Sequence, residues 1–120
     1  MKEKIEKEIS ASAEELGVQH FVSWDGFQAE GFSIDPKCEM MSTLGECFER
    51  VKGHPPSFSP ITATTDARFF NLYYGVPATC LGPLAHNIHG IDESVDIQSI
   101  LDVTKILVRF ISEWCKLDKI

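Results

Sequence analysis

Residues 61–83 read ITATTDARFFNLYYGVPATCLGP, and the order of residue types in this stretch decides the fold class. Its first five residues are small or β-branched, which favours a short buried strand. Residues 66–75 predict a short helix that Thr65 or Asp66 caps and Gly75 ends. Residues 76–83 predict another short buried strand. The stretch therefore predicts a strand, a helix and a strand in succession.

Two longer helices are predicted on either side of this stretch. The first begins with Asp35 as its N-cap and Pro36 at the first helical position, and it ends at Gly53. The second covers residues 97–117, where apolar residues recur every three or four positions and form a face that should cover a sheet. From residue 35 onward the chain thus predicts an α/β fold with at least two parallel strands. So few short strands make a poor sheet alone, and we expect this part to need strands from elsewhere.

The first third of the chain has a different pattern. Residues 3–16 carry one apolar stripe on a helix that Gly17 should end. Two β-prone runs follow, at 18–24 and 27–33, joined by a pair of residues, Asp25-Gly26, that suits a hairpin turn. A helix and a hairpin bury little surface between them, so this unit also looks like part of something larger. We expect a boundary near Ser33 to Asp35, which divides the chain into residues 1–33 and residues 34–120.

Composition limits the class of protein. The chain has 120 residues, of which 43% are hydrophobic and 24% charged, as in one small globular unit. A net charge of -7 argues against nucleic acid as a partner, because no basic stripe is present to neutralise phosphates. No apolar run approaches the roughly 20 residues of a membrane span, and the charged amino terminus is unlike a signal peptide. We expect no membrane partner and a cytoplasmic location.

The cysteines support the same expectation. No two of them form a C-x-x-C pair, so they suggest neither a zinc ribbon nor a secreted disulfide framework. We interpret them as small buried residues in a reducing compartment. They are Cys38, Cys47, Cys80 and Cys115.

A candidate metal site lies in residues 82–94, which read GPLAHNIHGIDES. His86 and His89 stand three residues apart after a predicted strand, where a loop can direct an imidazole into a cleft. A catalytic zinc ion needs about three protein ligands, and nothing nearby supplies the others. The alternative is that both are ordinary loop histidines. A paired carboxylate, Glu14-Glu15, lies among charged residues of the first helix, where a solvated surface role is favoured.

The second candidate site is TATTDARFF, residues 62–70. Threonine hydroxyls at the end of a strand and Arg68 one turn into the next helix can together hold an anionic group of a substrate. Equally, Thr65 and Asp66 can cap the helix while Arg68 pairs with a surface carboxylate. The residues alone do not separate these two interpretations.

Taken together, TATTDARFF, the Gly-Val-Pro run, LGPLAHNIHGIDESV and a last helix ending FISEWCKL resemble a known family. They are similar to the carboxyl-terminal region of the co-catalytic zinc metallopeptidases and deacylases of clan MH, which include acetylornithine deacetylase, succinyl-diaminopimelate desuccinylase and the aminoacylases. The likeness is strongest over residues 60–116. It implies a catalytic α/β zinc domain interrupted by a smaller ferredoxin-like lid or dimerisation domain. Residues 1–33 would then be the end of the lid, as a helix plus a β-hairpin, and residues 34–120 the second half of the catalytic domain.

The resemblance also implies roles for five residues. His89 matches a zinc ligand, whereas His86 has no counterpart. Thr64 matches a threonine at the substrate pocket, and Arg68 is a candidate for recognising a substrate carboxylate. Asp66 and Glu93 would orient or support these groups without touching the metal or the substrate. No catalytic residue is expected here, because the family's general base and its other zinc ligands lie upstream of these motifs.

The function implied is hydrolysis of the amide bond of small N-acyl amino acids by an enzyme with two zinc ions, with cobalt or manganese as possible substitutes. This chain would supply at most one metal ligand, would be inactive alone as a fragment, and would form a homodimer or otherwise self-associate. Two alternatives remain. One is a natural short protein that keeps this part of the fold as a non-catalytic interaction or dimerisation module. The other is an α/β domain without metal whose motifs match by chance.

Overall fold

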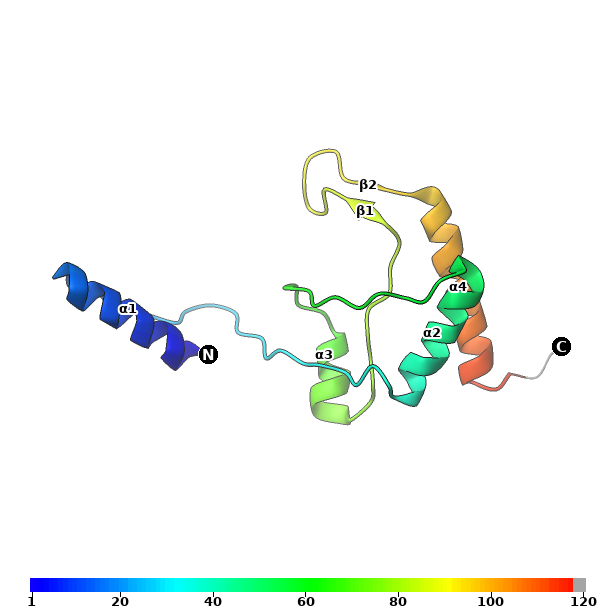
Figure 1. The fold of residues 1–120 in the computed structure, drawn as a ribbon, viewed down its shortest axis with the longest axis horizontal. Helices are drawn as coiled ribbons and strands as arrows, with labels where there is room; N and C mark the ends of the chain where they lie inside the picture. The colour runs from blue at the N-terminus through cyan, green and yellow to red at the C-terminus, as the bar shows by residue number, and fades with distance from the viewer. Residues whose placement is uncertain (118–120) are drawn as a thin grey trace.

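Four helical elements and one small hairpin follow one another in the computed structural model, which describes residues 1–117. They are α1 (Lys2–Leu16), α2 (Glu39–Lys52), α3 (Ala67–Phe69) continued by the π-helical turn η1 (Phe70–Tyr74), the strands β1 (Ala85–His86) and β2 (Ser94–Val95), and α4 (Ile97–Trp114). Figure 1 shows α1 apart from the other elements, at the end of an extended segment. The radius of gyration is 20.5 Å, whereas a compact chain of this length would have about 14 Å.

Helix α1 confirms the helix predicted at residues 3–16. It ends where Gly17 adopts the left-handed conformation, with φ of 65°. The N–H of Gly17 donates to the carbonyl of Glu14, and the N–H of Val18 donates to the carbonyl of Ala13. These bonds satisfy carbonyls that the helix itself leaves unpaired.

The hairpin predicted at residues 18–33 is wrong, because the described residues there form no strand. Gly26 does take a positive φ of 91°, as a turn residue would. The flanking runs, however, bond to α1 through side chains instead of to each other. Lys2 Nζ donates to Gln28 Oε1 over 2.6 Å, Trp24 Nε1 donates to Glu6, and the Ser10 hydroxyl lies 3.0 Å from the His20 ring.

Helix α2 begins later than the sequence predicts. Asp35 does not cap it: its carboxylate accepts from the N–H of Lys37, and its carbonyl accepts from the N–H of Cys38, so residues 35–38 form a turn. Cys38 is the N-cap residue, with an extended backbone, and Glu39 opens the helix. The predicted end is confirmed, since Gly53 is left-handed with φ of 76°.

The core lies between α2 and α4. Met40, Met41 and Cys47 of α2 are buried, as is Ile106 of α4. Two ion pairs border this contact: Lys52 with Asp102 at 2.7 Å and Arg50 with Glu113 at 2.5 Å. The long predicted helix is confirmed except that it ends at Trp114, but it covers another helix, where the sequence predicted a sheet (Figure 1).

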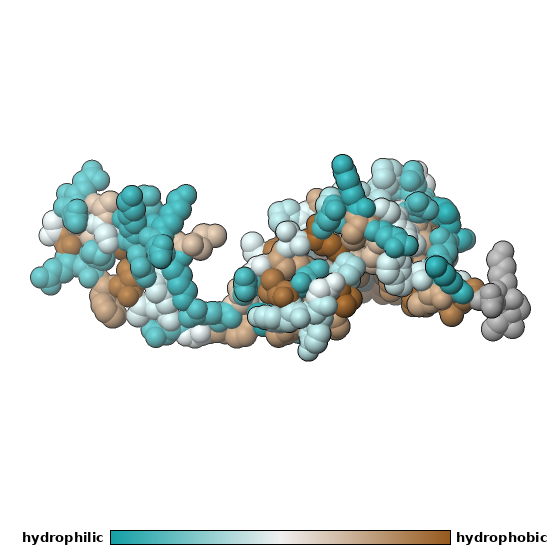
Figure 2. Space-filling model, turned by 90° about the horizontal axis from the view of Figure 1, so that it is seen from below, coloured by the Kyte–Doolittle hydropathy of each residue, from teal (hydrophilic) through white to brown (hydrophobic). Residues whose placement is uncertain are grey.

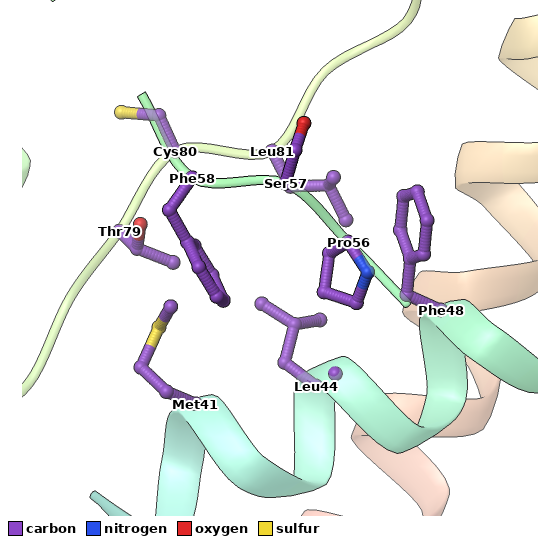
Figure 3. A pocket seen from close by; sticks show the side chains of 10 residues that line it. Met41, Leu44, Phe48, Pro56, Ser57, Phe58, Thr79, Cys80 and Leu81 are labelled. Atoms are coloured by element: carbon purple, nitrogen blue, oxygen red, sulfur yellow. The ribbon is translucent and has the colours of Figure 1, made fainter. Parts of the chain in front are cut away.

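The two parallel strands predicted at 61–65 and 76–83 do not form. The strand pair present in the described residues is antiparallel, with Ala85 opposite Val95 and His86 opposite Ser94. A strand is stable only where a neighbour takes up its backbone N–H and C=O groups. The segment around Ser57 and Phe58 passes beside residues 79–81 (Figure 3). These two segments line a surface hollow and do not pair as strands. The mixed helix-and-strand character is therefore confirmed, while parallel pairing is absent from residues 1–117.

Much apolar surface stays uncovered. The accessible surface is 10046 Å², against about 6,500 Å² for a compact protein of this mass. Figure 2 shows apolar residues reaching the surface in the N-terminal part and in the part that holds α2 and α4. The expectation for the cysteines is also corrected in part: Cys47 is buried and Cys38 half-buried, but Cys80 and Cys115 are exposed. Both lie on segments that the described residues cover only in part.

Candidate functional site

The hairpin β1–β2 presents the histidine-bearing loop of residues 87–93. Three residues of this loop that are not glycine have positive φ: Asn87 at 52°, His89 at 64° and Asp92 at 60°. A side chain with a Cβ is generally disfavoured in this region by roughly 1–2 kcal/mol, although Asn, Asp and His occupy it several times more often than other residues with a Cβ. Such strain persists only where the surrounding structure determines the backbone, and it is common at functional sites.

His89 stands within this loop, while His86 lies in β1. Both residues are exposed. The imidazole hydrogen bonds present among residues 1–117 belong to His20 and His54. The His89 ring thus has no protein partner in the described chain, and its nitrogens are accessible to a ligand. Glu93 is also exposed, directly before β2.

The start of α4 anchors this hairpin. Asp96 caps the helix, its carboxylate accepting from the N–H of Ser99 over 2.6 Å. The Ser99 hydroxyl in turn accepts from the N–H of Leu84 over 2.9 Å, immediately before β1. Both ends of the hairpin therefore meet at the first turn of α4.

The second candidate site surrounds α3. Thr65 rather than Asp66 caps the helix, because its hydroxyl accepts from the N–H of Ala67 over 3.0 Å. Thr64 and Asp66 are exposed. Arg68 is half-buried, and its guanidinium carbon lies 4.4 Å from the centroid of Phe69 and 5.3 Å from that of Phe27. Two aromatic rings therefore flank this guanidinium group, and the described residues give it no carboxylate partner within 4.0 Å.

Asn71 fastens this short helix to the chain that follows. Its side-chain nitrogen donates to the carbonyls of Ala67 and Ala78, each over 2.8 Å, and its side-chain oxygen accepts from the N–H of Ala78 over 3.3 Å. Three bonds from one amide hold the backbone from which Arg68 projects. Our sequence interpretation missed Asn71 and Ser99, because each side chain bonds to backbone that is adjacent only in the folded chain; the Asp-x-x-Ser spacing at 96–99 was the one available signal.

The structure brings together some of the predicted site residues and separates others. Thr64, Asp66 and Arg68 share one turn, whereas His89 and Glu93 belong to the hairpin at the far end of residues 75–84 (Figure 1). The surface hollow in Figure 3 is lined instead by apolar residues of α2 and two connecting segments, including Met41, Leu44, Phe48 and Phe58. A second hollow lies between α2, residues 76–81 and α4. None of the five predicted residues lines either hollow.

A complete metal site is not present among residues 1–117. No group of three or more His, Cys, Asp or Glu side chains is close enough there to hold an ion. Imidazole is a ligand type that zinc prefers, so His89 fits such an ion, but a catalytic zinc needs about three protein ligands. The other ligands would have to come from outside the described residues.

A membrane span requires a helix of sufficient length and apolar character. No helix in the described part of the chain is both long and apolar enough to cross a bilayer.

The mixed helix-and-strand fold with its histidine-bearing hairpin belongs to a defined class. The model of the family described as Peptidase family M20/M25/M40 matches residues 8–113. The chain therefore belongs to this peptidase family, and the alternative of motifs matching by chance is wrong.

Individual relatives are named as a desuccinylase and a deformylase. A succinyl-diaminopimelate desuccinylase from Helicobacter hepaticus is 38% identical over 82 residues, which are 68% of this chain and 21% of the relative. An N-formyl-4-amino-5-aminomethyl-2-methylpyrimidine deformylase from Bacillus subtilis is 32% identical over 88 residues, or 72% of this chain and 20% of the relative. The chain thus spans about a fifth of the length of these curated relatives.

Proposed function

We propose that this chain contributes part of the active site of a metal-dependent amidohydrolase that cleaves the amide bond of small N-acyl amino acids. The observation that carries the proposal is the family match over residues 8–113, which includes every predicted site residue. The names of the relatives, a desuccinylase and a deformylase, support amide hydrolysis as the reaction type. N-Acetylornithine is the first substrate to test; its deacetylation is a step of arginine biosynthesis.

In this proposal residues 1–33 end a lid or dimerisation domain, and residues 34–120 form the second half of a catalytic domain. The large uncovered apolar surface supports the idea that both parts pack against further structure. The complete enzyme would work in the cytoplasm as a homodimer, without nucleic acid or membrane as partners. This chain alone would be inactive.

His89 would hold one of two zinc ions, with cobalt or manganese as alternative metals to test in the assay. When bound, the metal would polarise the amide carbonyl and lower the pKa of a bound water towards neutrality. The strained loop would present the His89 imidazole with its nitrogens free of competing protein hydrogen bonds. Its role is to bind and orient, since the described residues offer no general base beside it.

Arg68 and Thr64 would bind the carboxylate of the substrate. The guanidinium group lies over the rings of Phe27 and Phe69, and no hydrogen bond or ion pair within residues 1–117 uses its N–H groups. A carboxylate accepts two parallel hydrogen bonds from the edge of a guanidinium group. The Thr64 hydroxyl, four residues earlier and exposed, is available to add another. Asp66 and Glu93 would support the Arg68 turn and the His89 loop respectively.

The decisive experiment uses the complete gene product that contains this sequence. Hydrolysis of N-acetylornithine, N-succinyl-diaminopimelate and an N-formyl amine is measured with added zinc, together with zinc affinity by competition with a chelating dye. We expect His89→Ala to lower both kcat/KM and zinc affinity by more than about 100-fold. His86→Ala is the matched control and should change either value less than about threefold. Equal effects of the two changes would refute the assignment of His89.

A separate pair of variants tests the carboxylate site. Arg68→Lys keeps the charge but loses the planar two-pronged donor, so KM should rise by about tenfold or more while zinc affinity stays unchanged. Arg68→Ala should have the larger effect. A normal KM in both variants would instead favour the surface ion-pair interpretation of Arg68.

The uncovered apolar surface also fits a second function. A module that packs against another protein exposes such surface when its partner is absent, so this observation supports both functions. A natural interaction or dimerisation module would show no hydrolysis with any of the three substrates. The mass of the native gene product, measured on peptides from residues 60–116, separates the two functions: several hundred residues would support the enzyme, and a mass near 13.4 kDa would support the module.

A further inference from the structure

Ser99 is the one polar side chain that is buried among the described residues, at 6% exposed. A buried hydroxyl has to find partners, because leaving it unpaired costs free energy. Here it finds two on different segments. Its oxygen accepts from the N–H of Leu84 over 2.9 Å, and its O–H donates to the carbonyl of Asp96 over 2.6 Å.

These two bonds join the beginning of the hairpin to its end. Leu84 directly precedes β1, and Asp96 directly follows β2. A backbone bond adds to the connection, since the N–H of Asp96 donates to the carbonyl of Leu84 over 2.9 Å. Both backbone groups of Leu84 are thus taken up by residues of the helix start, one of them through Ser99.

The loop between these ends has little to hold it otherwise. The hairpin consists of two residue pairs, and a two-stranded hairpin of this size is at best marginally stable in water. Its loop nevertheless keeps three residues other than glycine at positive φ. Such a backbone is kept where the surrounding structure supports it. Within residues 1–117, the bonds of Ser99 and Asp96 join both ends of the hairpin to α4, and inside the loop the N–H of Gly90 donates to the carbonyl of Asn87.

We propose that Ser99 is a positioning residue for His89: by fastening Leu84 to the first turn of α4, it holds the hairpin in the conformation that presents the imidazole. That Ser99 orders the hairpin rests on the geometry alone. That this order serves metal binding rests on the proposed function.

The first test measures hydrogen exchange on the full chain by mass spectrometry. Ser99→Ala should speed exchange of the hydrogen-bonded amides in residues 84–96, those of Leu84 and Asp96 first, by about tenfold, because the N–H of Leu84 loses its acceptor and the hairpin opens more often. Ser99→Thr keeps the hydroxyl and should restore slow exchange. Amides of α2 should be unaffected in both variants, which shows that the chain remains folded.

Thr104→Ala is the matched control. It removes a hydroxyl from the same helix, but one that bonds only to the carbonyl of Ile100 within α4, so the hairpin should exchange as in the wild type. Unchanged exchange at residues 84–96 in Ser99→Ala would overturn the proposal. So would an equal acceleration in Thr104→Ala, since the effect would then belong to the helix.

The second test measures zinc affinity of the complete gene product by dye competition. If the hairpin serves a metal, Ser99→Ala should weaken zinc binding by about tenfold, Ser99→Thr should restore it, and His89→Ala should weaken it much more. One outcome is faster exchange in Ser99→Ala with zinc affinity unchanged in both Ser99→Ala and His89→Ala. That outcome would refute the proposed function, while the role of Ser99 in ordering the hairpin would stand. Weakening by His89→Ala with no effect of Ser99→Ala would refute the positioning role alone.

Discussion

Gly90 follows His89 at the point where the loop turns back most tightly. Its N–H donates to the carbonyl of Asn87 over 2.6 Å. A Cβ at this position would lie 2.9 Å from that same carbonyl oxygen, closer than real Cβ contacts allow. The conformation of His89 therefore depends on a neighbour that has no side chain.

Gly90→Ala should disrupt this turn. Relieving the contact requires the backbone at Asn87 to move, at a local cost of about 1–3 kcal/mol. We expect exchange of the amides of residues 86–94 to accelerate by tenfold or more. Gly31→Ala is the control, because a Cβ there meets nothing within 4 Å and the backbone needs no positive φ. Slow exchange in both variants would show that the turn tolerates a side chain.

At the scale of elements, the contact between α2 and α4 is the part of the fold with a buried core. Burial raises the pKa of the Cys47 thiol, and the carboxylate of Glu113 raises it further. At the other end of the contact, the hydrogen bond from Lys52 and a second from Gln98 lower the pKa of Asp102 below its ordinary value of 3.8. The pKa of each group is shifted by a residue of the other helix, so both pKa values depend on the contact between α2 and α4.

Ile106→Ala should weaken this pairing most directly. Ile106 is 1% exposed, so removing its side chain leaves a cavity and should lower the free energy of unfolding by about 2–5 kcal/mol. Val108→Ala on the same helix is the control; Val108 is 63% exposed, and the cost should stay near about 0.5 kcal/mol. Urea unfolding followed by circular dichroism compares the two. Similar losses would contradict the packing of α4 on α2.

The Asp102 carboxylate should make the helix pair sensitive to acid. A pKa that is lower in the folded state stabilises the fold above the unfolded pKa of 3.8, and this contribution disappears as pH falls through the folded value. Asp102→Asn should therefore reduce the loss of Tm between about pH 6 and about pH 2.5. Asp35→Asn, at the turn before α2, is the control. An unchanged acid dependence in Asp102→Asn would exclude this carboxylate as a cause.

At the scale of the whole molecule, the uncovered apolar surface should control behaviour in solution. Helix α4 packs on α2 along one side, yet Ile97, Leu101, Val108 and Ile111 are at least half exposed. A helix that is apolar on most sides is normally buried on most sides. We therefore expect the 120-residue chain to associate with itself when nothing else covers α4.

Sedimentation velocity at increasing concentration measures this association. The average sedimentation coefficient should rise for the wild type over roughly the micromolar range. Val108→Lys places a charge on the uncovered side and should shift association to at least about tenfold higher concentration. Gln98→Lys adds the same charge at an exposed polar position of α4 and should change little. A wild type that stays monomeric throughout would contradict the expectation.

Some features of the candidate site depend on neighbouring residues in the sequence, and others depend on residues that meet only in the folded chain. The turn at Thr64 to Arg68 was predictable, because an oxygen-bearing cap and a following glycine act on adjacent residues. Three other features were not predictable: the His89 imidazole without a hydrogen-bond partner in residues 1–117, the aromatic neighbours of Arg68, and the support from Ser99. Phe27 and Arg68 are far apart in the sequence, and no periodicity shows that their side chains meet.

The sequence by itself determined the three long helices and their glycine ends at Gly17 and Gly53, because apolar periodicity and left-handed caps are properties of neighbouring residues. It also determined the family, through motifs in a set order. Only the tertiary structure decided that residues 61–65 and 76–83 are not strands, that α4 packs on α2, and that His89 rests on a strained hairpin. Those outcomes depend on which backbone and side-chain groups are available nearby in space, and a strand without a neighbour cannot pair however suitable its residues are.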